Sequence, residues 1–341
     1  MAKPVIIPPV DDFSPISSDR VSVVIQGPIL REPYGDRPTT QDSLRSVRAH
    51  LPQAEIILST WDGSDISGLV GFDKVITSPD PGGIWNYIKE RHNNVNRMIR
   101  STSRGLALAT REYCLKFRTD LQLTSDRICR VDTSGERSDP YSLLSLPITI
   151  TTYYVRDPSV IPMAFHPSDI VQFGRTSDLV DFWDQPQVDP KWLVRPRPIL
   201  SLFGRYAGFS PMRIVPEQVV TLQWLAKRNI HIDLQDTFDI SFDAYRTWEQ
   251  VLLRNFRLMN ASDSGVEFYA RLRRKKFFTP RANFTETTFA KIGREQSVPR
   301  LWKRWGSAVL SKYLYCFFYV RYYKRLWWTY RRYKAWTLQE K

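Results

Sequence analysis

The chain has 341 residues, of which 42% are hydrophobic and 13% aromatic, so it can bury a substantial core and is not a disordered protein. Its net charge of +14 is concentrated at one end, because residues 300–341 hold eleven basic side chains against one acid. Three cysteines without Cys-x-x-Cys spacing argue against a disulfide framework or a zinc site, and the polar start of the chain argues against a secretory signal. We expect a globular protein of the reducing cytoplasm.

Alternating strands and helices are predicted along residues 21–125, after an extended lead-in over residues 1–20. VSVVIQGPI (21–29) is an apolar run closed by a glycine and a proline, as in a strand buried on both faces. The pattern then predicts a helix at 40–50, strands at 54–60 and 73–77, a helix at 93–110 and a strand at 115–117. Such alternation predicts an α/β fold with a mostly parallel sheet flanked by helices.

The second half, residues 126–299, is less regular. LPITITTYYV (146–155) alternates like a strand, and VQFG (171–174) is a second strand candidate. PEQVVTLQWLAKRN (216–229) predicts a helix, with proline at the first helical position. The strongly basic residues 300–341 form a separate tail.

A candidate ligand site follows from the stretch CLKFRTDLQL (114–123), which places Asp120 at the end of a strand. The preceding helix runs antiparallel to that strand, so its first residues, including Asn96 and Arg97, should face the same crevice as Asp120. A carboxylate beside amide and guanidinium groups suits a metal-diphosphate ligand. The alternative is that Asp120 is an ordinary turn residue.

The segments VSVVIQGPI, AEIILSTWDGSDISGL, NNVNRMIRSTSRGLALA, YCLKFRTD and VPEQ, in this order, resemble the WavE family of lipopolysaccharide-synthesis proteins over residues 20–230. That family is regarded as glycosyltransferase-like, so the resemblance implies a GT-A-like, Rossmann-type fold that binds a nucleotide sugar. Residues 21–125 would be the donor half and 126–299 the acceptor half. GT-A enzymes often carry Asp-x-Asp where this chain has Arg118-Thr119-Asp120, which leaves Asp120 alone to ligate Mn²⁺ or Mg²⁺.

The nucleotide-sugar donor is expected to meet residues that follow the strands of the first half. These are Gln26, Gly27, Thr60, Asp62, Asp65, Asn96, Arg97 and Asp120. The loop after the first strand lacks Gly-x-Gly-x-x-Gly, which argues against a dinucleotide fold. For the aspartates of WDGSD a plain turn is an equal alternative.

Two acids compete as the base that removes a proton from the acceptor hydroxyl. Glu217 lies in VPEQ at a helix start, and Asp169 lies in HPSDIVQFG beside a predicted strand. Either acid is also explained by a purely structural helix cap. His166 titrates near neutral pH, but a lone histidine is more often a packed or surface residue.

The tail carries an aromatic face and a basic face at helical spacing. The aromatic face comprises Tyr319, Tyr322, Tyr323, Leu326, Tyr330 and Tyr333, and the basic face comprises Arg321, Lys324, Arg325, Arg331 and Arg332. This pattern predicts an amphipathic helix on an anionic membrane surface, which would hold the protein peripherally on the inner membrane face. Docking onto the catalytic domain or a second subunit, and nucleic-acid binding, are the alternatives.

Two functions remain open from the sequence. The first is a glycosyltransferase that moves a sugar from a nucleotide donor to a hydroxyl of a surface glycan or lipid-linked oligosaccharide. The second is a non-catalytic basic scaffold or nucleic-acid-binding protein with a Rossmann-like core. Binding of a nucleotide sugar separates the two.

Overall fold

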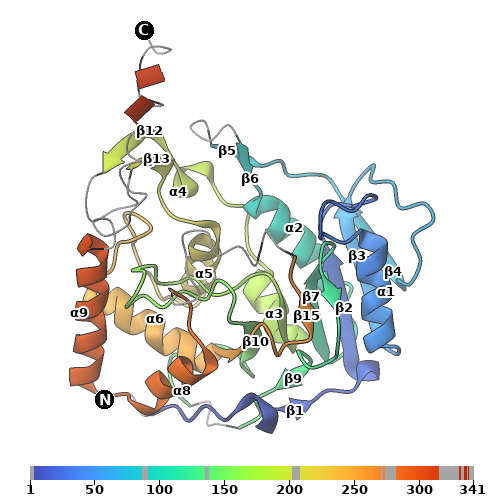
Figure 1. Ribbon diagram of the computed structural model, residues 1–341, viewed down its shortest axis with the longest axis horizontal. Coiled ribbons are helices and arrows are strands. Elements are labelled where there is room, and N and C mark those ends of the chain that lie inside the picture. The colour runs from blue at the N-terminus through green and yellow to red at the C-terminus, as the bar shows by residue number, and fades with distance from the viewer. Residues whose placement is uncertain are drawn as a thin grey trace.

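A central sheet with helices on both faces organises the computed structural model, which describes residues 4–86, 91–134, 138–201, 208–269, 272, 282–314, 330–331, 334–335 and 337 (Figure 1). The strand order is β14-β10-β11-β7-β2-β3-β4. These strands span β2 (Val21–Gln26), β3 (Glu55–Trp61), β4 (Lys74–Ser78), β7 (Tyr113–Arg118), β10 (Ile148–Thr151), β11 (Gln172–Arg175) and β14 (Phe256–Met259). Only β11 runs antiparallel to its neighbours, which confirms the predicted mixed α/β fold with a mostly parallel sheet.

Helices cover the two faces of this sheet. They are α1 (Thr40–His50), α2 (Val95–Leu106), α3 (Thr176–Trp183), α4 (Pro190–Leu193), α5 (Pro216–Ala226), α6 (Phe242–Asn255), α8 (Glu286–Arg294) and α9 (Val298–Leu314), with 3₁₀ turns at Val10–Asp12 and Ser18–Arg20. Apolar side chains of α1 join one core with Val23 and Ile25, whereas those of α2 and α3 join a second core with Val24. Alternate residues of β2 therefore point into the two cores, as in a strand between two helical layers.

Short two-stranded sheets decorate the edges of the molecule. They pair β1 (Ser14–Pro15) with β9 (Arg130–Val131), β5 (Ile84–Asn86) with β6 (Arg91–Asn93), β8 (Gln122–Leu123) with β15 (Val266–Glu267), and β12 (Val194–Ser201) with β13 (Gly208–Met212). Only residues 213–215 separate β13 from α5.

The helix α1 shows how local sequence fixes an element boundary. It begins at Thr40 as predicted, because the Thr39 hydroxyl accepts the Asp42 backbone N–H while the Asp42 carboxylate accepts the Thr39 N–H. Leu44 and Val47 bury the inner face. The helix ends at His50, also as predicted.

Gly105 lets α2 lie unusually close to the sheet. A Cβ atom at this position would lie 2.3 Å from Val24 Cγ1 and 3.2 Å from Ser59 Cβ. Only glycine avoids these overlaps, so the end of α2 is pressed against β2 and β3. The start of the same helix reaches the carboxyl ends of the strands, as the sequence predicted.

The beginning of the basic tail belongs to the folded core. Figure 1 shows α9 at the edge of the molecule beside α6, where Trp302 stacks on Phe242 with ring centroids 4.1 Å apart. Arg304 forms an ion pair with the buried Glu249 of α6. Residues up to Leu314 therefore pack on the folded core, whereas docking of the aromatic face beyond them stays an untested alternative.

The membrane-contacting part of the tail stays a prediction. Most of the residues that were predicted to contact a membrane, including 315–329, lie outside the described residues. No helix in the described parts of the chain is long and apolar enough to cross a bilayer.

Candidate active site

A cavity of about 680 Å³ opens at the carboxyl ends of β2 and β7. From β2 the chain builds β3 and β4 on one side, and it then crosses over to place β7 on the other side. The cavity thus lies at the topological switch point of an open, mostly parallel sheet, where such folds bind their ligands. The loop after β2, the end of β3, the starts of α2 and α5, and the loop before β11 complete its wall.

Asp120 lies at the floor of this cavity with its carboxylate 2% exposed. Its Oδ1 accepts Arg118 Nε at 2.8 Å, and its Oδ2 accepts Arg118 Nη2 at 2.7 Å and the Tyr269 hydroxyl at 3.1 Å. Arg37 Nη2 lies 3.1 Å from Oδ2 as well. Burial alone would raise the pKa of Asp120, but the hydrogen bonds and charge of Arg118 outweigh it and lower this pKa.

These contacts do not fit a divalent cation at Asp120. Both carboxylate oxygens already accept hydrogen bonds, and the groups that crowd them are two positively charged guanidinium groups. A cation there would be repelled by Arg118 and Arg37 and would have to displace them. Among the described residues no cluster of three or more histidine, cysteine, aspartate or glutamate side chains offers an alternative metal site.

Gln26 and Gly27 line the cavity, as the sequence analysis expected. The Gln26 side chain accepts a hydrogen bond from Ser101 of α2 at 2.6 Å, which fixes its orientation. Gly27 has φ +133°, and a Cβ there would lie 2.8 Å from Thr119 Oγ1. Glycine at this position therefore allows the chain to turn out of β2 against the end of β7.

Arg97 and Asn96 both belong to the first turn of α2 but serve different purposes. Arg97 lines the cavity and forms a two-pronged ion pair with Asp80, with N–O distances of 2.7 and 2.6 Å. Asn96 is buried and exchanges two hydrogen bonds with the backbone of Val188. The structure thus places Arg97 in the cavity wall and uses Asn96 to hold the segment before α4.

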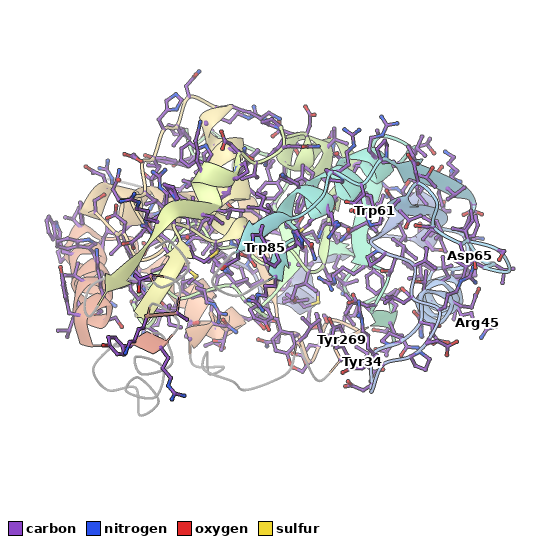
Figure 2. All side chains as sticks on the ribbon, turned by 90° about the horizontal axis from the view of Figure 1, so that it is seen from above. Tyr34, Arg45, Trp61, Asp65, Trp85 and Tyr269 are labelled. Atoms are coloured by element: carbon purple, nitrogen blue, oxygen red, sulfur yellow. The ribbon has the colours of Figure 1, made fainter. Side chains whose placement is uncertain are left out.

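The three residues predicted near the end of β3, Thr60, Asp62 and Asp65, lie outside the cavity lining. Thr60 is buried and contacts Ser64, whereas Asp62 and Asp65 are exposed. Asp65 pairs with Arg31 at 2.8 Å, and Figure 2 shows it at the outer edge of the molecule beyond Trp61. The residue of this segment that does line the cavity is Trp61.

Glu217 and Asp169, the two predicted base candidates, both line the cavity, as Asp120 does. Glu217 is the second residue of α5 and is 22% exposed, with Oε2 3.5 Å from His166 Nε2. Burial raises the pKa of Glu217 to about 8, and the negative charge of Asp169 adds to that shift. Glu217 therefore takes up a proton near neutral pH, unlike an ordinary surface carboxylate.

His166 is a buried neighbour of Glu217. Its Nδ1 lies 2.8 Å from the Tyr154 carbonyl oxygen, so Nδ1 carries the proton and Nε2 faces Glu217 as an acceptor. Burial, with the nearby Arg156, lowers the pKa of His166 to about 3. The imidazole is therefore neutral, and it gives the protonated form of Glu217 a polar neighbour.

The backbone beside this pair is strained on both sides. Tyr154, whose carbonyl meets His166, has φ 66°, and Phe165, which precedes His166, has φ 58°. Bulky residues rarely adopt the left-handed region, and such strain clusters at functional sites. Gln218 adds support, because its Nε2 donates to the Ala164 carbonyl at 2.9 Å.

Sequence reasoning missed several cavity residues, of which Lys116 is the most informative. It is fully buried in β7, donates to the backbone carbonyl of Asp169, and lies 4.7 Å from the centre of the Trp183 ring. Burial lowers the pKa of Lys116 to about 8. A lysine within an otherwise buried strand was the available signal. The sequence around Arg37 and Tyr269 contained no such signal, because long-range packing brings these residues to Asp120.

Comparison with known proteins identifies the family. A search of curated proteins finds no match. A family model described as WavE lipopolysaccharide synthesis matches residues 21–329. That span runs from β2 through α9 and includes every element that lines the cavity. The chain belongs to the WavE lipopolysaccharide-synthesis family.

Proposed function

We propose that this protein is a glycosyltransferase of lipopolysaccharide synthesis that binds a nucleotide-sugar donor in the cavity at the ends of β2 and β7. The observation that carries the proposal is that one cavity combines two kinds of group. Its lining includes the guanidinium groups of Arg118 and Arg37 together with the Glu217 carboxyl. A GT-A-like reading of the fold is supported by the open, mostly parallel sheet and by the position of the cavity along its carboxyl edge.

Sugar transfer needs opposite charges at the two ends of the donor. The bond between the sugar anomeric carbon and the diphosphate oxygen breaks, and its electron pair leaves with the diphosphate. A new bond forms from the acceptor hydroxyl oxygen to the same carbon, and the hydroxyl proton passes to a base. Cationic groups stabilise the departing diphosphate, and a carboxylate accepts the proton.

Glu217 is the better base of the two candidates. A carboxylate with a pKa of about 8 binds the acceptor proton more firmly than an ordinary acid and still releases it near neutral pH. Asp169, in this assignment, supplies the negative charge that helps to raise the pKa of Glu217. Lys116 fixes the loop by donating to the Asp169 carbonyl.

The nucleoside is assigned to the side of the cavity formed by Trp61 and the first turn after β2. Trp61 offers an aromatic face on which a base can stack, at about 1–3 kcal/mol for such a contact. Gln26 and Gly27 line the same side of the cavity. The acceptor then approaches Glu217 from the α5 side.

The acceptor is proposed to be a glycan or lipid-linked oligosaccharide, which agrees with the lipopolysaccharide-synthesis family. Membrane attachment is proposed for the tail beyond α9, where aromatic and basic residues repeat at helical spacing. The enzyme would then work in the cytoplasm, held peripherally at the inner membrane face. Sedimentation with anionic vesicles, for the full chain and for a chain ending at residue 314, tests this: equal partitioning of both opposes it.

Thermal unfolding with UDP, GDP, CDP, ADP and CMP, followed by transfer assays with the responding sugar nucleotides, tests the catalytic proposal. A bound nucleotide should raise the unfolding temperature, because it stabilises only the folded state. Glu217→Gln should keep that rise while losing transfer. Lack of response to every nucleotide would favour the non-catalytic scaffold.

A further inference from the structure

The contacts of Asp120 determine what the cationic end of the cavity can bind. Arg118 and Arg37 contribute two positive charges around a single buried carboxylate, so this cluster keeps a net positive charge. The side chain of Arg118 is 33% exposed and that of Arg37 is 26% exposed, whereas Asp120 is 2% exposed. The carboxylate thus lies beneath the guanidinium groups, and the guanidinium groups border the cavity.

Arg37 still has unused donor capacity in this arrangement. Its Nε is buried and has no hydrogen-bond partner among the described residues. Its guanidinium group also lies 5.8 Å from the centre of the Tyr269 ring, which restricts its position. A buried donor without an acceptor is costly, so the described protein contacts do not fully satisfy Arg37.

The other cations of the cavity wall are already engaged. Arg97 has the carboxylate of Asp80 as its own partner, and Lys116 donates to a backbone carbonyl beside Asp169, whereas Arg118 and Arg37 share the single carboxylate of Asp120. Excess positive charge is therefore concentrated at Arg118 and Arg37. The planar guanidinium group suits the oxygens of a phosphate, because it donates two parallel hydrogen bonds.

We propose that Arg118 and Arg37 bind the diphosphate of the donor directly, without a divalent cation, and that Asp120 is a positioning residue that holds both guanidinium groups in place. This inference rests on the proposed function, and it reassigns Asp120 from metal ligand to anchor. The positive charge of the two arginines then balances the negative charge that develops on the leaving diphosphate.

Calorimetric titration of the full chain with inorganic pyrophosphate and with UDP, each in EDTA and in Mn²⁺, tests the inference. We expect pyrophosphate binding in EDTA, at least tenfold weaker in Arg118→Gln and in Arg37→Gln. Arg118→Lys should recover part of it, because the charge returns without the planar fork. The matched control is Arg104→Gln, an exposed arginine late in α2, which should bind like the parent chain.

Asp120→Asn separates the two roles of the carboxylate. In our assignment it weakens pyrophosphate binding a few fold, equally in EDTA and in Mn²⁺, because the arginines remain but lose their anchor. Pyrophosphate binding that requires Mn²⁺ in the parent chain and is lost in Asp120→Asn would overturn the inference. Absence of pyrophosphate binding in every condition would also overturn it. Pyrophosphate binding without binding of any nucleotide would keep the anion site and remove the glycosyltransferase proposal.

Discussion

Asp120 and Glu217 line the same cavity but have opposite surroundings. Two guanidinium groups and a tyrosine hydroxyl surround the carboxylate of Asp120, and its pKa is lowered. The half-buried carboxyl group of Glu217 faces a neutral imidazole and is close to another acid, and its pKa is raised to about 8. The surroundings of Asp120 therefore keep it charged and paired with cations, whereas those of Glu217 allow it to exchange a proton near neutral pH.

The largest expected effect is loss of transfer in Glu217→Gln, which removes the proton acceptor. We expect turnover to fall by about 10²–10⁴-fold, while nucleotide binding remains. Asp169→Asn should reduce turnover by about tenfold or less, because it only lowers the pKa of Glu217. Initial rates with saturating donor compare the two variants, and the reverse ranking would transfer the role of base to Asp169.

The free energy of unfolding of Asp120→Ala tests whether Asp120 anchors the two arginines. It leaves two partly buried arginines without their shared partner, which we expect to cost about 2–4 kcal/mol of the free energy of unfolding. Urea denaturation at pH 7 measures the loss. The exposed Asp65→Ala is the matched control and should change stability by less than about 0.5 kcal/mol; an equal effect at the two sites would contradict the anchoring role.

The pH dependence of stability sharpens the contrast between the acids. The pKa of Glu217 is about 8 in the folded chain and 4.5 in an ordinary environment. Between pH 4.5 and pH 8 the folded state therefore keeps a proton that the unfolded state has released. Stability from this group is present at low pH and is lost as the pH rises from about 4.5 to 8. At pH 8.5 the free energy of unfolding of Glu217→Gln, measured by urea denaturation, should therefore exceed that of the parent by at least about 1 kcal/mol. At pH 4 the two free energies should be similar.

His166→Asn should give the smallest change, a shift in the pH profile of transfer. Asparagine keeps a donor for the Tyr154 carbonyl but is too short to contact Glu217. The protonated form of Glu217 then loses its neighbour, so the pH of half-maximal activity should fall from near 8 by about half a unit. A profile unchanged in position, with only the rate reduced, would assign His166 a purely structural part.

The sequence predicted the first half of the sheet well because local signals determine it. The apolar runs of β2 and β3 and the capped helix α1 appear where their patterns placed them. The helix α6 and the strand β14 were not predicted, since long-range packing against α9 and β10 stabilises them. Local pattern also placed Asp120 and Arg97 at the carboxyl edge of the sheet, where the cavity lies.

Partners in the site were harder to predict than positions. Asp120 follows its strand as expected, but Arg37 and Tyr269 come from loops far away in the chain. Nothing in the local sequence states that these two would surround it. Arg118, two residues before Asp120, was the local signal of a cationic site.

The close packing at Gly105 gives the cavity a remote point of control. Arg97 lies eight residues earlier on the same helix, about 12 Å away along the axis. One added methyl group at Gly105 would overlap Val24, so α2 could not keep its present distance from β2. The distance between the sheet and the helix that carries Arg97 therefore depends on a residue outside the cavity lining that has no side chain.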